Sequence, residues 1–252
     1  MANYIQGDKL TEIVIPLLVT PFDKSSEVLS PPRELVGTGF LIGANGFALT
    51  AAHVIDQLIE TRKDNEVLST HLLDGNGLHP FLIVDHEKHP TEDVGILRLE
   101  NHNLKSFLAI SNKRYLHSTP YIAWGYPRET AEELLFIREN ADLFPDIIFI
   151  EGYIRRVIHH ELRLTIFKGN RFYEVSDLGG PGYSGSPVIA KNSLNMNLWE
   201  VLGIYIGEKD GLIAPVGYVV PSRNFFDWKP NILGCTIIEE SNRGNTNLFD
   251  KK

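Results

Sequence analysis

The hydrophobic residues of this chain fall into short runs that are separated by Gly, Pro, Asn and Asp. Short runs rich in Val, Ile, Phe and Tyr between turn residues predict β-strands. Asn45-Gly46, between Gly39–Gly43 and Phe47–Thr50, is typical of a tight hairpin turn. The other predicted strands are Ile13–Val19, in which Pro16 indicates an edge or a bend, Val94–Leu99, Tyr121–Trp124, Ile147–Ile150, Leu162–Phe167, Pro187–Ala190, Val201–Ile206 and Val216–Val220.

Helical patterns are sparse. They predict one short helix over Thr130–Glu139 and a second over Ser222–Trp228, which starts at a Ser suited to the N-cap. Many short strands without alternating helices predict an all-β chain, built as an antiparallel barrel or a sandwich. A length of 252 residues is large for one small barrel and sufficient for two. The polar stretch Asn112–Thr119 separates two strand-rich halves and marks the predicted joint.

Composition excludes several classes of protein. An apolar fraction of 43% is too high for a disordered chain, and no apolar run is long enough to span a membrane. The net charge of −8 argues against a phosphate-binding surface, and so against binding of nucleic acid. Cys235 is the single cysteine, so no internal disulfide forms, and we interpret it as a small buried hydrophobic residue. The N-terminus has no basic segment followed by an apolar core, so we expect a reducing, cytoplasmic location.

Candidate chemistry is concentrated in three segments. These are Leu49–Val54, which contains His53, Glu92–Leu97, which contains Asp93, and Gly180–Pro187, which contains Ser184.

The three residue types together supply what acyl transfer requires. A serine hydroxyl is a weak nucleophile at neutral pH, so an imidazole must take its proton during attack. A carboxylate must hold that imidazole in the correct tautomer and stabilise the imidazolium. We therefore predict Ser184 as nucleophile, His53 as general base and Asp93 as its orienting group. The N–H groups of Gly182 and Ser184 are the predicted oxyanion hole. The order His, Asp, Ser excludes the chain orders of α/β-hydrolases and subtilisins.

The three motifs resemble those of the trypsin-like (chymotrypsin-fold) serine proteases. Thr50-Ala51-Ala52-His53 is similar to the family's histidine motif, Asp93–Leu97 to its aspartate motif, and Gly182–Pro187 to its serine motif. The nearest type is the bacterial stand-alone and high-temperature-requirement group. Supporting matches are Gly37–Phe40, Gly125–Pro127, Glu151–Ile154 and Val216–Ser222.

The resemblance implies two antiparallel six-stranded barrels with the active site in the cleft between them. It places the N-terminal barrel, with His53 and Asp93, at residues 10–115. The C-terminal barrel, with Ser184 and the oxyanion hole, spans residues 116–235. Residues 236–252 form a polar tail, of which we expect Glu239–Lys252 to fray. No peptide-binding domain is expected after the second barrel. The implied activity is that of a serine endopeptidase that acts on proteins or peptides and needs no metal or organic cofactor.

One departure from the digestive family members concerns regulation. Those members carry an Asp before the nucleophile that pairs with the N-terminal amine after zymogen cleavage, whereas this chain has Tyr183. We therefore expect control through loop ordering or an activating protein partner, with Ala131–Asp146 as the candidate segment.

The position six residues before the nucleophile, where Asp sets the basic preference of trypsin, is Leu178, and Asp177 stands beside it. Tyr205 and Ile206 are further candidates for the substrate pocket. We expect a small or apolar side chain before the scissile bond.

The motifs His86–His89 and His159–Glu161 suggest metal ligands, but neither has the spacing of a zinc site, so we interpret them as solvated loops or strand edges.

Two other functions remain open. A catalytically silent protease fold that serves as a binding module is the alternative to an active enzyme. A protease that stays latent until a partner orders its loops combines both possibilities.

Overall fold

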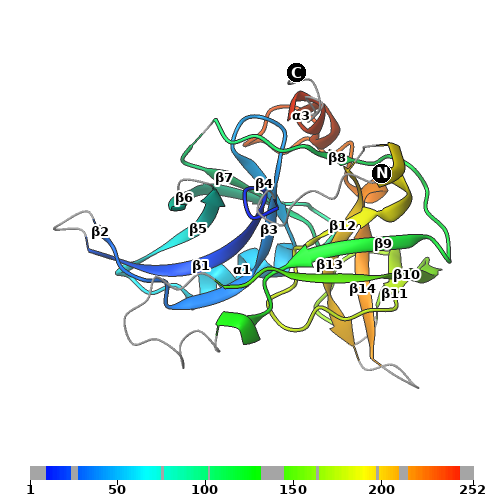
Figure 1. The fold of residues 1–252 in the computed structure, drawn as a ribbon, viewed down its shortest axis with the longest axis horizontal. Coiled ribbons are helices and arrows are strands. Elements are labelled where there is room, and N and C mark those ends of the chain that lie inside the picture. Colours follow the sequence, from blue (N-terminus) through cyan, green and yellow to red (C-terminus); the bar gives the residue numbers. More distant parts are fainter. Residues whose placement is uncertain are drawn as a thin grey trace.

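A computed structural model describes residues 10–23, 28–74, 77–101, 103–131, 145–162, 165–196, 199–209 and 215–244. Figure 1 shows two strand-rich halves side by side, the first in blue to teal and the second in green to orange. Each half is a closed barrel of six antiparallel strands with one further strand attached. The fold predicted from the family resemblance is confirmed.

The first barrel consists of strands of residues 14–99. Its members are β1 (Val14–Asp23), β3 (Glu34–Ile42), β4 (Phe47–Thr50), β5 (Glu66–Asp74), β6 (Gly77–Lys88) and β7 (Gly95–Leu99), with the short β2 (Val28–Leu29) added to β1. The order is β1-β3-β4-β7-β6-β5, and pairing of β1 with β5 closes the barrel. The predicted Asn-Gly hairpin is present, with Phe40 opposite Leu49. Buried Val, Ile, Leu and Phe side chains fill the interior, which is the main stabilising contribution.

The second barrel follows the same plan. Its members are β9 (Pro120–Gly125), β10 (Ile148–Ile158), β11 (Phe172–Val175), β12 (Pro187–Ala190), β13 (Trp199–Lys209) and β14 (Val216–Pro221). Pairing of β12 with β13 closes it, and β8 (Leu108–Ile110) adds to β13 in parallel orientation. Because β8 precedes residue 115, the second sheet begins before the expected boundary between the two barrels.

Several predicted elements differ from the observed ones. Leu162 and residues 165–167, the described part of the strand predicted over Leu162–Phe167, are not in a strand. The predicted helix Thr130–Glu139 and the segment Ala131–Asp146 lie mostly outside the described residues, which end at 131 and resume at 145. The helix predicted over Ser222–Trp228 is a single 3-10 turn, η3 (Ser222–Asn224), and a second such turn, η2 (Lys191–Met196), follows β12.

The expectation that the tail frays is wrong for its first part. Residues Ile237–Gly244 form helix α3, which packs against β8 and β3. The Glu240 side chain is 0% exposed, and its carboxylate accepts hydrogen bonds from the Ala44 amide and the Asn45 side chain. A buried charge is tolerated only with such partners. The polar residue Glu240 thus fastens the tail to the hairpin turn of the first barrel.

No helix among the described residues is long and apolar enough to span a membrane. Cys235 is half-buried, and burial raises the pKa of its thiol. The thiol is therefore poorly suited to act as a nucleophile.

Candidate active site

His53 stands in the first turn of α1 (Ala52–Thr61), an amphipathic helix that directly follows β4. Its backbone N–H is one of the first amides of the helix, which have no acceptor within the helix itself. The Asp93 carboxylate accepts that N–H at 3.0 Å through Oδ1 and contacts the His53 Nδ1 at 2.8 Å through Oδ2. One buried carboxylate, 1% exposed, therefore caps the helix and orients the imidazole.

This arrangement sets the tautomer of His53. Because an ionised carboxylate only accepts hydrogen bonds, the Nδ1 of the ring carries the proton. The Nε2 atom is then an acceptor for a further proton. The positive end of the α1 dipole also favours the negative charge on Asp93.

Ser184 lies in the turn before β12 on the second barrel. Its neighbours Gly182 and Gly185 have φ angles of +90° and +96°, which favour glycine. A Cβ atom on Gly185 would stand 1.9 Å from the Thr38 carbonyl oxygen, so the first barrel lies directly against this turn. The amide of Thr38 in turn donates to the Ser184 carbonyl at 2.9 Å. The nucleophile turn is thus held between the barrels.

The Ser184 hydroxyl donates to the carbonyl of Ile206 at 3.2 Å. Among the described residues no hydrogen bond joins it to His53. Hydrogen bonds of this kind are often loose without substrate, and rotation about the Cα–Cβ bond of Ser184 redirects the hydroxyl. The structure therefore brings Asp93 and His53 together but leaves Ser184 engaged elsewhere.

The N–H groups of Gly182 and Ser184 have no acceptor within the described part of the chain. The peptide before Gly182 has a fixed orientation, because the Arg128 amide donates to the Pro181 carbonyl at 2.7 Å. In a planar trans peptide the carbonyl and the following N–H point in opposite directions. The N–H of Gly182 therefore points away from Arg128. An oxyanion hole requires backbone N–H groups that are free to donate in this way.

Thr38 links the two barrels at this point and is completely buried. Its hydroxyl donates to the Gly182 carbonyl at 2.9 Å and accepts the Tyr126 amide at 2.9 Å. Its carbonyl accepts the Thr50 hydroxyl at 2.7 Å. Thr38 belongs to the motif Gly37–Phe40, and these bonds give it a positioning role that the sequence does not show.

Tyr183 is also buried, and it cannot form the ion pair that the digestive proteases use. Its hydroxyl donates to the Ile148 carbonyl at 3.2 Å, and its ring packs edge-on against Tyr205. The Tyr205 hydroxyl accepts the Gly179 amide at 3.2 Å. Burial raises the pKa of both phenols, so both remain neutral. Neutral tyrosines thus fasten the segment that leads to the nucleophile.

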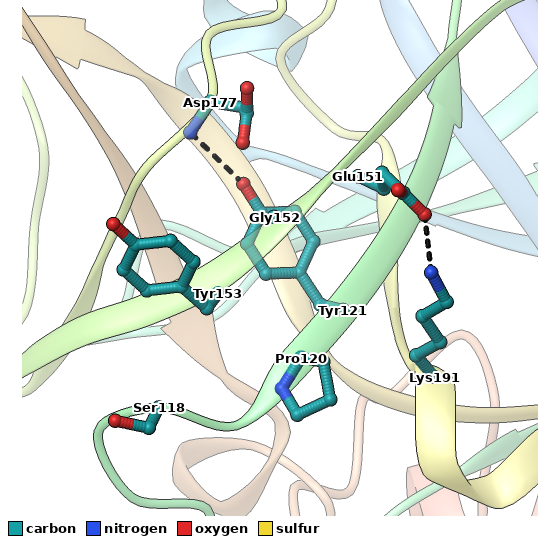
Figure 2. A pocket seen from close by; sticks show the side chains of 8 residues that line it. All are labelled: Ser118, Pro120, Tyr121, Glu151, Gly152, Tyr153, Asp177 and Lys191. Atoms are coloured by element: carbon teal, nitrogen blue, oxygen red, sulfur yellow. Dashed lines mark hydrogen bonds and ion pairs between the residues drawn. The ribbon is translucent and has the colours of Figure 1, made fainter.

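A third tyrosine holds the start of the same segment. Figure 2 shows the Tyr121 hydroxyl beneath the backbone of Asp177, from which it accepts an N–H at 3.3 Å. These residues border an open hollow of about 650 Å³ on β9 and β10, with the ion pair of Glu151 and Lys191 at its rim. None of the predicted catalytic residues lines this hollow.

The residues predicted to form the substrate pocket lie in two different environments. Leu178 is 37% exposed and stands on the segment that the tyrosines fasten. The side chains of Tyr205 and Ile206 are buried in the core of the second barrel. The group of Ile206 that faces Ser184 is the backbone carbonyl.

The connection between β10 and β11 reaches across to the first barrel. The Phe167 ring lies 5.7 Å from the His53 ring, and the Lys168 carbonyl accepts the Asp93 amide at 3.1 Å. Beside it, the Glu92 carboxylate accepts the Asn224 side chain at 2.9 Å. Burial raises the pKa of Glu92. No residue type marks the contact between Lys168 and Asp93 in the sequence, because it joins two backbone atoms.

The histidine motifs do not gather into a metal site. His89 packs edge-on against Trp228, and its Nδ1 accepts the amides of Thr91 and Glu92. Within the described ranges, no group of three His, Cys, Asp or Glu side chains is arranged to hold a metal ion. His89 therefore helps to shape the turn that carries Asp93.

Comparison with known proteins places these features in context. A family model described as "Trypsin-like peptidase domain" matches residues 37–204. Comparison with curated proteins finds no match.

Solved structures agree with this chain in fold. The MamO protease domain from Magnetospirillum magneticum superposes with a TM-score of 0.58 at 14% identity, covering 88% of this chain and 97% of that chain. The active form of the Rv3671c protease from M. tuberculosis superposes with a TM-score of 0.52 at 19% identity, covering 84% and 78%. Deg5 superposes with a TM-score of 0.53 at 13% identity, covering 86% and 91%.

Proposed function

Because the chain belongs to the trypsin-like peptidase domain family, we propose that it is a serine endopeptidase in which Ser184 is the nucleophile. The observation that carries the proposal is the hydrogen bond between the buried Asp93 carboxylate and the His53 Nδ1. It leaves the Nε2 of His53 as a proton acceptor. The substrate class is an unfolded protein or a peptide, and no cofactor takes part.

The reaction proceeds in two halves. Ser184 Oγ attacks the carbonyl carbon of the scissile peptide bond, and its proton passes to the His53 Nε2. The negative charge on the carbonyl oxygen is stabilised by the N–H groups of Gly182 and Ser184. The tetrahedral intermediate collapses, the C–N bond breaks, and His53 gives its proton to the leaving amine.

Water completes the second half. It attacks the acyl-enzyme while giving a proton to His53, and the ester bond to Ser184 breaks as His53 returns that proton to Oγ. Asp93 stays ionised and stabilises the imidazolium in both halves.

Hydrolysis of unfolded casein and labelling by a fluorophosphonate probe test the proposal. Wild type is expected to be labelled, whereas Ser184→Ala is not. Asp93→Asn is expected to lower kcat by about 10⁴-fold, because the imidazole adopts the wrong tautomer. Asp56→Asn is the matched control, since Asp56 lies on α1 and pairs with Lys88 at the surface. Equal labelling of wild type and Ser184→Ala would refute the assignment of Ser184.

A latent or catalytically silent form is the second candidate. It is favoured by the Ser184 hydroxyl, which donates to the Ile206 carbonyl instead of His53. The Rv3671c protease, similar in fold, has been solved in an active and an inactive form. We propose a protein partner that activates this chain by ordering its loops, with Ala131–Asp146 as the candidate segment.

Adding cell lysate to the labelling reaction separates the possibilities. A latent protease is labelled faster with lysate, whereas a silent binding module is labelled under neither condition. Full-rate casein hydrolysis by the isolated protein would exclude both a latent protease and a silent binding module.

A further inference from the structure

A small pocket on the second barrel gathers three arginines from separate parts of the chain. Its volume is about 230 Å³, and its lining includes Val157 of β10, Tyr173 of β11 and Pro221 of β14. The rest of its lining consists of Arg114, Tyr115, His159, Arg171 and Arg223. None of the residues proposed for catalysis belongs to it.

The three guanidinium groups have no ion-pair partner among the residues that the structure describes. The register of the sheet explains why no carboxylate lines the pocket. Val157 pairs with Tyr173, whereas Glu174 lies one residue further and forms an ion pair with Arg156. Neighbouring residues of a strand point to opposite faces, so Glu174 lies on the other side of the sheet.

The arginines influence the pKa values of two neighbouring residues. Arg171, Arg223 and Arg114 each lower the pKa of Tyr173, although its burial raises that pKa overall. Arg171 likewise lowers the pKa of Glu92, which burial raises overall, without forming an ion pair with it. Three like charges that approach one group repel each other. A bound anion would offset this repulsion.

The hydrogen-bond donors in the pocket suit an oxyanion. Each guanidinium presents a planar set of N–H donors that matches phosphate and carboxylate oxygens. The Tyr173 hydroxyl accepts the Tyr115 amide at 3.3 Å, and its own proton has no acceptor in the described ranges. That O–H is a fourth donor for a ligand. The volume is below that of pockets for drug-sized ligands, so it fits a single anionic group with a small substituent.

We propose that this pocket binds a small multivalent oxyanion, namely phosphate or a phosphate monoester. Arg114, Arg171 and Arg223 provide the charge, and Tyr173 provides an uncharged donor. The site does not depend on the proposed peptidase activity, because binding is measured without substrate.

Isothermal titration calorimetry with inorganic phosphate, at constant ionic strength maintained with chloride, tests the site. Wild type is expected to bind phosphate with a dissociation constant on the order of 1 mM or tighter. The double substitution Arg171→Gln with Arg223→Gln is expected to weaken binding by about 100-fold, with each lost charge-assisted contact accounting for about tenfold. Arg62→Gln, which removes an exposed charge from the first barrel, is the matched control and should bind like wild type.

A parallel titration with O-phosphoserine identifies the source of the anion. Tighter binding of O-phosphoserine indicates a monoester ligand, and tighter binding of inorganic phosphate indicates the free anion. The three arginines are exposed, so the variants should unfold at the wild-type urea midpoint when no anion is present. Equal phosphate affinity of the double variant and wild type, or no binding by wild type, would overturn the proposal.

Discussion

Replacing Thr38 by Val tests whether the junction between the barrels holds the nucleophile turn in place. Val keeps the shape of the side chain and removes the hydroxyl, so Gly182 loses a donor and the Tyr126 amide loses an acceptor. Both groups are buried, and an unsatisfied buried polar group costs about 1–3 kcal/mol. We therefore expect Thr38→Val to lower the free energy of unfolding by about 2–5 kcal/mol. Labelling of Ser184 by a fluorophosphonate should also slow, because the carbonyl of Gly182 loses its anchor.

Urea denaturation followed by tryptophan fluorescence measures this loss as a lower midpoint. Thr38→Ser is the matched control, since it keeps the hydroxyl and loses one buried methyl group, which costs about 1 kcal/mol. Thr38→Val should therefore be the less stable of the two. A Thr38→Val variant as stable as wild type, or a Thr38→Ser variant that is equally damaged, would refute the reasoning.

Three further predictions concern other parts of the structure. Glu240→Ala leaves its half-buried hairpin donors without their acceptor and should cost about 2–4 kcal/mol by urea denaturation. A second prediction concerns the ion pair of Glu66 with Arg33, which lowers the pKa of Glu66 from 4.5 to about 2. This pair therefore stabilises the fold above pH 4.5, and its contribution is lost as the pH falls towards 2. The stability gap between wild type and Arg33→Gln should accordingly be on the order of 1–2 kcal/mol at neutral pH and shrink through that acid range, and a constant gap would contradict the assignment. Gly185→Ala brings a Cβ against the Thr38 carbonyl at a positive φ and should abolish fluorophosphonate labelling in any protein that still folds, as shown by circular dichroism.

The parts of the fold that could be predicted are those with a local signature. The Asn45-Gly46 turn fixes its hairpin, and the nucleophile segment depends on glycines whose backbone angles few other residues adopt. Strand β5 was missed because buried polar residues such as Ser69 and Thr70 interrupt its hydrophobic pattern. Their polar groups are satisfied across the barrel, as in the bond from the Thr70 hydroxyl to the Pro16 carbonyl.

Helix α1 was missed although its sequence carries a helical period. Ile55 and Leu58 are buried on one face, but the run before them has the pattern of a strand, and the N-cap residue Ala51 makes no side-chain hydrogen bond to the helix. The cap comes instead from the Asp93 carboxylate, 40 residues further along the chain than His53. A cap supplied from a distance leaves no mark in the local sequence.

The candidate site was predictable in its residues and not in its surroundings. His53, Asp93 and Ser184 stand in ordered motifs, whereas the contact of Lys168 with Asp93 uses a backbone carbonyl, which every residue type possesses. The arginine pocket shows the same limit, because only the closed barrel brings Arg114 and Arg223 together.

The central claim is that the Ser184 hydroxyl becomes a nucleophile with His53 as its base. The most direct measurement is mass-spectrometric mapping of the fluorophosphonate adduct on the intact chain, alone and with cell lysate. The account predicts an adduct on Ser184 that disappears in His53→Ala. An adduct on another residue, including the neighbouring Ser186, whose hydroxyl donates to the Tyr183 carbonyl at 2.6 Å, or no adduct under either condition, would contradict it.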